Sequence, residues 1–140
     1  MSEAVPVQLL LRTLIQPDNE RMQLSAAGTL TREQDMYVLR YQENLEDEER
    51  QVTLRMREGS VTIETEGSFS SLMLFETGRR FETFYQTPWG KLNMGVFPSL
   101  VETELALEKG RAHLIYQLDF DGGSSAQHDL MLRYRRREKE

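Results

Sequence analysis

Short stretches in which apolar and polar residues alternate run along most of the chain. The clearest cover residues 37–41, 52–56 and 101–105. Because successive side chains of a β-strand point to opposite faces, this alternation predicts strands with one buried and one solvent-facing side. Many one-sided strands in a small protein pack together only as an antiparallel barrel or sandwich.

Eleven such stretches predict roughly ten strands, and the residues between them are typical of turns. Glu58-Gly59-Ser60 and Pro88-Trp89-Gly90 have the composition of tight turns. Gly28, inside the second strand, predicts a bulge or a sharp bend of the kind that turns barrel corners. No stretch combines a helical period with caps, so the fold is expected to be all-β. The predicted strands are 5–14, 21–31, 36–42, 50–57, 61–66, 72–76, 81–87, 92–97, 100–107, 111–120 and 127–135.

The length and composition are those of an ordinary globular protein. With 140 residues, 39% hydrophobic and 29% charged, we expect one β-barrel domain over residues 1–140, ending in a short charged tail at 136–140. The apolar runs are too short to cross a bilayer, and the first residues do not look like a signal peptide. A cytoplasmic protein without a membrane partner is therefore expected.

Charge and cysteine content narrow the function classes. The chain has no cysteine, which excludes disulfides, thiolate catalysis and zinc–thiolate sites. Its net charge of −6 argues against a nucleic-acid partner, because phosphate binding needs excess positive charge. The basic run 133–139 is diluted by acidic residues, so it does not change that expectation.

Several short motifs follow one another in a specific order, from about Val7 to Tyr134. In this order and spacing they resemble the YwiB-like family of bacterial proteins, a family of unknown function. The resemblance implies a single antiparallel calycin-like (lipocalin-like) β-barrel of about eight to ten strands. Relatives of that fold often hold small apolar ligands, but no activity and no functional residue transfers with the resemblance. The motifs are Tyr41-Gln42-Glu43, Glu58-Gly59, Leu72-Met73-Leu74-Phe75 with Gly78, the run from Tyr85 to Leu92, Lys109-Gly110-Arg111 and Ile115-Tyr116-Gln117-Leu118.

Residue patterns that carry catalysis are missing from the sequence. There is no Gly-x-Ser-x-Gly motif, no phosphate-binding loop and no His-Glu-x-x-His motif. His113 and His128 fall several rows apart in the predicted last hairpin, so they are not expected to share a metal. Glu102 and Glu104 alternate with apolar residues as on a solvated face, and the acidic run 46–49 lacks the spacing of a calcium loop. We therefore expect no cofactor and no metal, and an enzyme is the weaker hypothesis.

An aromatic and basic group of residues is the best candidate for a ligand site. An aromatic wall with one or two arginines and a carboxylate is how a barrel mouth binds a small apolar or anionic ligand. The leading hypothesis is non-enzymatic binding of such a ligand in the barrel. The candidate residues are Tyr41, Glu43, Arg55, Arg79, Arg80, Tyr85 and Trp89.

Two alternatives stay open. The barrel interior can instead be filled with side chains, the protein acting through its surface or as a homodimer, with Trp89 on an exposed turn as the anchor. The weaker alternative is an enzyme that uses carboxylates and arginine inside the barrel.

Overall fold

The computed structural model describes residues 3–45, 48–123 and 125–137. These residues form strands and no helix, so no helix among them can span a membrane. The strands are β1 (Glu3–Gln16), β2 (Glu20–Glu33), β3 (Met36–Leu45), β4 (Glu48–Arg57), β5 (Ser60–Glu66), β6 (Ser71–Phe75), β7 (Phe81–Thr87), β8 (Gly90–Glu104), β9 (Lys109–Phe120) and β10 (Ala126–Arg136).

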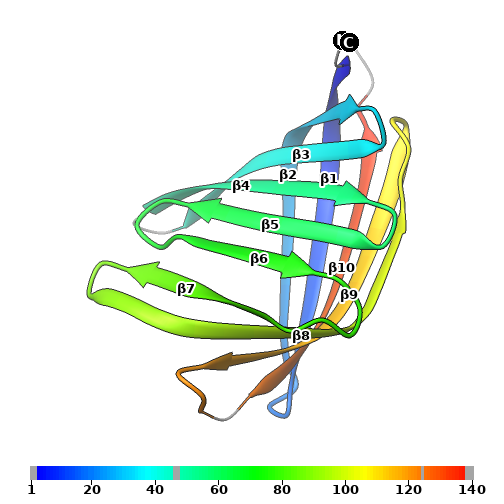
Figure 1. Ribbon diagram of the computed structural model, residues 1–140. Helices are drawn as coiled ribbons and strands as arrows, with labels where there is room; N and C mark the ends of the chain where they lie inside the picture. Colours follow the sequence, from blue (N-terminus) through cyan, green and yellow to red (C-terminus); the bar gives the residue numbers. More distant parts are fainter. Residues whose placement is uncertain (1–2, 46–47, 124, 138–140) are drawn as a thin grey trace.

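All ten strands belong to one antiparallel sheet that curls into a nearly closed barrel. The order is β6-β5-β4-β3-β2-β1-β10-β9-β8-β7, and the curl brings the edge strands β6 and β7 side by side (Figure 1). Ser70 and Gln86 join the two edges through a pair of backbone hydrogen bonds of 2.9 and 2.8 Å. The predicted all-β barrel of eight to ten strands is therefore confirmed.

The connections between strands gather at two ends of the barrel. Because consecutive strands alternate in direction, β1–β2, β3–β4, β5–β6, β7–β8 and β9–β10 are joined at one end, at the left and bottom of Figure 1. We call this the open end. The remaining connections lie at the opposite end, where β1 begins and β10 ends, and we call that the terminal end.

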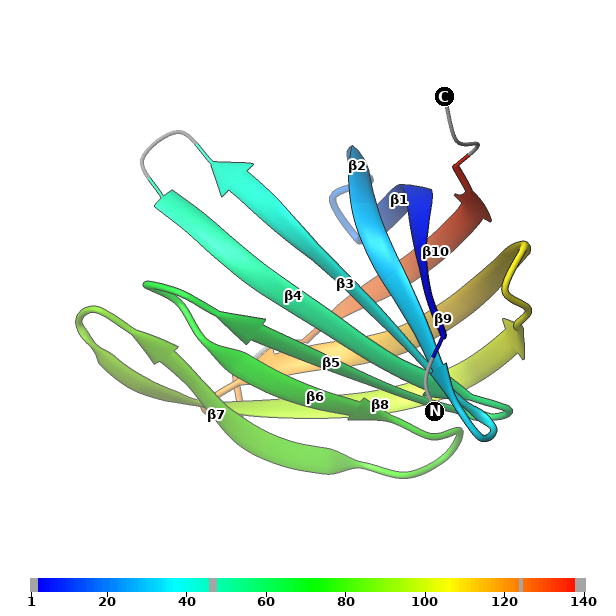
Figure 2. The same cartoon turned by 90° about the horizontal axis from the view of Figure 1, so that it is seen from above.

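The open end owes its shape to a separation of β2 from β3. Their pairing runs only from Gly28, opposite Tyr41, to Glu33, opposite Met36. Beyond it, residues 20–27 pair with β1 alone and residues 42–45 with β4 alone. Figure 2 shows the two strands diverging from their shared turn. The barrel wall is therefore split at the open end.

Gly28 lies where the two strands part, in a regular register rather than in the predicted bulge. A Cβ at this position would lie 2.7 Å from the carbonyl oxygen of Arg40. The glycine thus allows the backbones of β2 and β3 to approach at the last row before they separate. The sharp change of direction expected at this residue is a divergence of neighbouring strands.

The bulge lies in β8 instead. The predicted strands 92–97 and 100–107 are one strand, β8, whose register against β9 shifts between Pro98 and Leu100. Pro98 lacks the N–H that a regular ladder needs, and an extra residue at this point, Ser99, keeps the strand continuous. Sequence alone suggested a break because proline usually ends a strand.

Side chains from all around the wall fill the middle of the barrel. Phe75 of β6 and Tyr116 of β9 meet there, with ring centroids 4.8 Å apart. On β9 the alternation is regular, with Ala112, Leu114 and Tyr116 buried on the inner face. The fully buried residues from other strands include Val7, Leu30, Leu39, Leu54, Met56, Val61, Val96 and Leu132.

The expected C-terminal tail begins later than predicted. Arg136 is the last residue of β10, and its N–H donates to the carbonyl of Glu108 at 2.7 Å. The N–H of Arg137 donates to the carbonyl of Pro6 at 2.8 Å. The predicted tail is therefore ordered at its first two residues, and residues 138–140 lie outside the described part of the chain.

Candidate functional site

Four aromatic rings form a connected group at the open end. Tyr85 stacks on Phe69 with centroids 5.9 Å apart, and its other neighbour, Phe120, lies at 5.9 Å. Trp89 contacts the edge of Phe69 at 6.0 Å. We call Phe69, Tyr85, Trp89 and Phe120 the aromatic cluster. It joins the β5–β6 connection, β7, the β7–β8 turn and the end of β9.

The β7–β8 turn holds Trp89 outward. Pro88 presets one backbone angle, and Gly90 adopts a φ of +136°, which other residues rarely reach. Thr87 completes the turn, because its Oγ1 accepts the N–H of Trp89 at 3.1 Å and donates to the carbonyl of Gly90 at 2.8 Å. As a result the Trp89 side chain is 84% exposed.

Phe69 is positioned by the seam that closes the barrel. It directly precedes Ser70, whose backbone is bonded to Gln86, next to Tyr85. Phe69 therefore reaches the ring of Tyr85 from the neighbouring edge of the sheet. Phe120, the last residue of β9, lies opposite Met94 on the inner face and is still 38% exposed.

Tyr41 and Glu43 lie at the same end but in a separate polar chain. The Tyr41 hydroxyl donates to Glu43 Oε2 at 3.2 Å, and Arg50 Nη2 lies 3.1 Å from Glu43 Oε1. Burial, followed by the negative charge of Glu43, raises the pKa of the Tyr41 phenol above its usual value. The Glu43–Arg50 pair is half-buried and links β3 to β4 just beyond the last row of the packed core.

Two of the predicted arginines lie away from the open end. Arg55 is opposite Thr62, facing outward from the middle of β4, and pairs with Glu64 at 3.1 Å. Arg79 lies in the β6–β7 connection at the terminal end and pairs with Glu76 at 2.8 Å. Strand alternation puts these cations on another face or another end than the aromatic rings, which the sequence order alone did not reveal.

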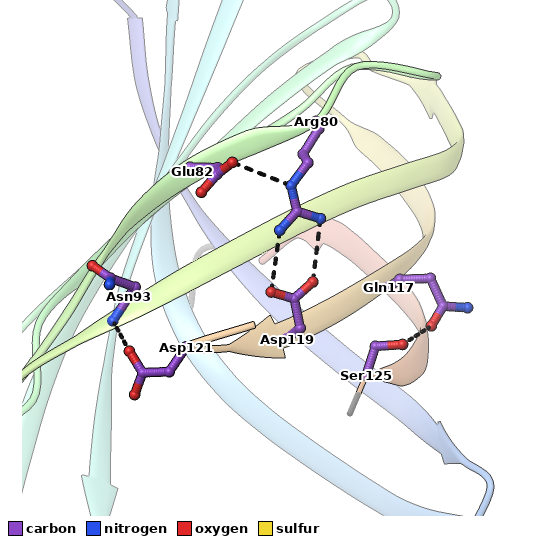
Figure 3. A network of polar contacts seen from close by, with 7 residues as sticks. All are labelled: Arg80, Glu82, Asn93, Gln117, Asp119, Asp121 and Ser125. Atoms are coloured by element: carbon purple, nitrogen blue, oxygen red, sulfur yellow. Dashed lines mark hydrogen bonds and ion pairs between the residues drawn. The ribbon is translucent and has the colours of Figure 1, made fainter. Parts of the chain in front are cut away.

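Arg80 takes part in a polar network on the outer face (Figure 3). Its two terminal nitrogens bind the carboxylate of Asp119 at 3.2 Å each, and its Nε donates to Glu82 at 3.4 Å. The guanidinium lies directly over Gly95, where an added Cβ would come within 2.1 Å of Arg80 Nη2. Asp119 and Glu82 raise the pKa of Arg80, the Asp119 hydrogen bond most. Arg80 thus fastens the β6–β7 connection across β8 to β9.

The structure therefore divides the predicted ligand residues. It brings together Tyr85 and Trp89, and it places Tyr41 and Glu43 at the same end. Arg55, Arg79 and Arg80 are engaged with carboxylates elsewhere. The sequence reasoning missed two members of the aromatic cluster, Phe69 and Phe120, because both border glycine- and serine-rich connections that read as loops. Phe120 could have been identified as an aromatic residue at the end of a strand, whereas Phe69 lies inside a connection and has no such sequence signal.

The two histidines lie on opposite faces of the last hairpin. His113 faces outward, with its Nε2 2.7 Å from Asp129 Oδ1. His128 faces inward and stacks on Tyr116, with centroids 5.0 Å apart. The observed pairs are His113 with Met131 and His128 with Tyr116, so the two histidines lie several rows apart in the hairpin. Within the described ranges, no three histidine, aspartate or glutamate side chains group closely enough to hold a metal ion.

Comparison with known proteins identifies the family. The crystal structure of the YwiB protein from Bacillus subtilis matches with a TM-score of 0.87 and 20% sequence identity, covering 96% of this chain and 94% of that one. At that identity the match shows a common fold. No curated protein matches the chain. A sequence family described as "Domain of unknown function (DUF1934)" matches residues 10–132. The chain therefore belongs to the DUF1934 family, and the YwiB-like relationship predicted from its ordered motifs is confirmed.

Proposed function

We propose that the protein binds a small, largely apolar ligand at the open end of its barrel, without catalysing a reaction. The observation that carries this proposal is the aromatic cluster. Its rings touch one another, yet Trp89 is 84% and Phe120 38% exposed. Aromatic rings held in place by backbone contacts and left partly bare are typical of ligand sites.

Other inner-face residues extend the apolar surface at this end. Leu92 lies opposite Tyr85 and is 38% exposed, and Met22, opposite Thr13 on the divergent part of β2, is 59% exposed. Each 100 Å² of such surface that a ligand covers contributes about 2.5 kcal/mol. The part of β2 that carries Met22 pairs with β1 alone, because β2 and β3 have separated there.

The middle of the barrel is a poorer place for a ligand. Phe75 and Tyr116 are in contact across it, and the residues around them are fully buried. The binding hypothesis therefore moves from the interior to its opening. Tyr41 and Glu43 would border the ligand there, and the arginines at positions 55, 79 and 80 have no part in it.

Trp89 provides the test, because it is the only tryptophan in the chain. We expect titration with oleate to shift Trp89 emission to shorter wavelength and to saturate. Phe120→Ala should weaken the binding at least about fivefold, since roughly 1 kcal/mol of contact is lost. The matched control is Phe97→Ala. The exposed fraction of Phe97, 40%, is similar to that of Phe120, but Phe97 lies opposite Gln117 on the outer face.

The comparison of the two variants distinguishes a specific site from non-specific binding to exposed apolar surface. Equal loss in the two phenylalanine variants, or no saturable change across fatty acids, nucleotides and sugar phosphates, would contradict binding at the aromatic cluster. The proposed cytoplasmic location and the calycin-like relationship stay predictions from the sequence.

A second candidate function is a homodimer in which Trp89 lies in the interface. A tryptophan exposed at 84% on a tight turn is also a typical interface anchor, which favours a homodimer built around Trp89. The mass of the protein in solution, measured for the wild type and for Trp89→Ala, tests it. A dimer that dissociates on substitution supports this function, and an unchanged mass contradicts it.

A further inference from the structure

A basic groove of about 850 Å³ lies on the outer face of the wall, far along the strands from the aromatic cluster. Strand alternation puts Leu10 of β1, Arg133 and Arg135 of β10, and Lys109 and Arg111 of β9 on this face, opposite to buried Leu9, Tyr134 and Ala112. The connection after β8 forms one side. The residues that line the groove are Gln8, Leu9, Leu10, Ser25, Glu104, Leu105, Ala106, Lys109, Gly110, Arg111, Arg133, Tyr134 and Arg135.

The groove places like charges directly opposite each other. Arg133 pairs across the strands with Arg111, and Arg135 pairs with Lys109. Opposite residues in an antiparallel pair lie about 5 Å apart, and like charges there destabilise a sheet. Glu104, the carboxylate in the lining, is bound to Arg111. In the described part of the chain, Lys109, Arg133 and Arg135 have no ion-pair partner.

The connection between β8 and β9, which forms one side of the groove, is held in place by Tyr134. The Tyr134 hydroxyl donates to the carbonyl of Ala106 at 2.7 Å and accepts its N–H at 3.3 Å. To reach it, the ring crosses Gly110, where a Cβ would lie 2.3 Å from the hydroxyl oxygen. Burial raises the pKa of Tyr134 to about 12, so it stays a neutral donor. The connection that carries Leu105 and Ala106 is thereby fixed beside the cations.

We infer that this groove is a second binding site, for a phosphorylated small molecule of nucleotide size, with Lys109, Arg133 and Arg135 holding its phosphates. Arginine binds phosphate through two parallel hydrogen bonds, and neighbouring cations along one strand lie roughly 7 Å apart, which suits successive phosphates. Half-buried Leu10 and Leu105 offer an apolar surface to the organic part.

Size and charge favour a small molecule over a polymer. Sites for small ligands have volumes of roughly 300–1,000 Å³, and the groove falls within that range. The net charge of −6 repels a long polyanion. A compact ligand with two or three phosphates needs only the local excess of cations.

The test is calorimetric titration of the full chain with ATP, compared with inorganic triphosphate. For Arg133→Gln/Arg135→Gln we expect ATP binding at least about tenfold weaker than wild type. The control Arg21→Gln/Arg40→Gln removes the same charge from exposed positions outside the groove, and its affinity should stay within about twofold. Equal weakening in the two double variants, or no saturable ATP binding, would overturn the inference.

A variant with the opposite expected sign guards against simple loss of folding. Glu104→Gln removes the carboxylate from the groove and releases Arg111, so ATP should bind about threefold tighter or more. Unchanged or weaker binding would contradict the site.

Two further titrations identify the ligand class. Inorganic triphosphate should bind more weakly than ATP, and equal affinities would overturn the role of the apolar surface. A short single-stranded oligonucleotide that binds more tightly than ATP would overturn the assignment to a small molecule.

Discussion

The middle and the open end of the same barrel differ in how far their aromatic rings are covered by other side chains. In the middle, Phe75 is fully buried and meets Tyr116 across the interior. At the open end, Phe120 lies opposite Met94 on the inner face and Trp89 extends from the β7–β8 turn, and solvent reaches 38% and 84% of their surfaces. One wall therefore carries both a packed core and an uncovered aromatic surface.

The difference shows where stability and binding are located. Apolar side chains stabilise the fold in proportion to the area they bury, so the middle supplies most of the stability. The rings at the open end contribute less to folding, yet Thr87, Gly90 and the Ser70–Gln86 bridge hold them in place. An ordered but uncovered apolar surface is more economically explained by a ligand or partner than by the fold.

Truncating one ring in each region should reveal the largest difference in stability between the middle and the open end. Phe75→Ala leaves a cavity in packed surroundings and should lower the free energy of unfolding by about 3–5 kcal/mol. Phe120→Ala should lower it by about 1 kcal/mol or less, because the ring is already partly solvated. Urea unfolding measures both. Equal losses would mean that the open end is as tightly packed as the middle.

Gly28 lies at the boundary between the two regions. Gly28→Ala brings a methyl group within 2.7 Å of the Arg40 carbonyl, a backbone atom that cannot move alone. We expect a loss of about 1–3 kcal/mol in the free energy of unfolding. The control Ala27→Ser changes the neighbouring exposed residue and should alter it by less than about 0.5 kcal/mol. A tolerated Gly28→Ala would show that the strands do not need this close approach.

The polar chain beside the open end should matter less. Tyr41→Phe removes the hydroxyl that donates to Glu43 Oε2 at 3.2 Å. Since Glu43 keeps Arg50 as a partner, we expect a loss of about 0.5–1.5 kcal/mol in thermal or urea unfolding. A larger loss would show that Tyr41 supports the core mainly through its hydroxyl.

The smallest effect should come from His128, on the inner face between the two regions. Burial lowers its pKa below 6.5, more than the nearby charge of Glu20 raises it. Protonation therefore favours the unfolded chain, so this contribution to stability is complete above about pH 6.5 and is lost as the pH falls through the pKa of the folded state. His128→Gln should reduce the decline in unfolding free energy between pH 7 and pH 5, while the control His113→Gln keeps His128 and should retain it. An unchanged decline in His128→Gln would contradict this origin.

The sequence predicted the fold better than the site. Alternation defined the strands, because it reports which side chains share a face, and the hairpin turns at Gly59 and at Pro88-Trp89 fixed the local pairing. It did not reveal that 92–97 and 100–107 form one strand, because a bulge at Ser99 lets β8 continue past Pro98.

The site depends on information that a strand pattern does not carry. Tyr85 and Trp89 belong to one hairpin, and Phe69 contacts the rings of both. Arg79 is near in sequence to those rings but lies in a connection at the other end of the barrel, and Arg80 binds Asp119 on the outer face. Phe69 joins the cluster only through the closing seam, a contact set by the curl of the whole sheet.

The most direct test of ligand binding at the open end is a titration with oleate followed by backbone amide chemical shifts. We expect the changes to concentrate at Phe69, Tyr85, Trp89 and Phe120, while Phe75 and Leu132 in the packed middle stay unperturbed. Changes centred on Phe75 and Tyr116, or no saturable change at the aromatic cluster, would contradict binding at the open end.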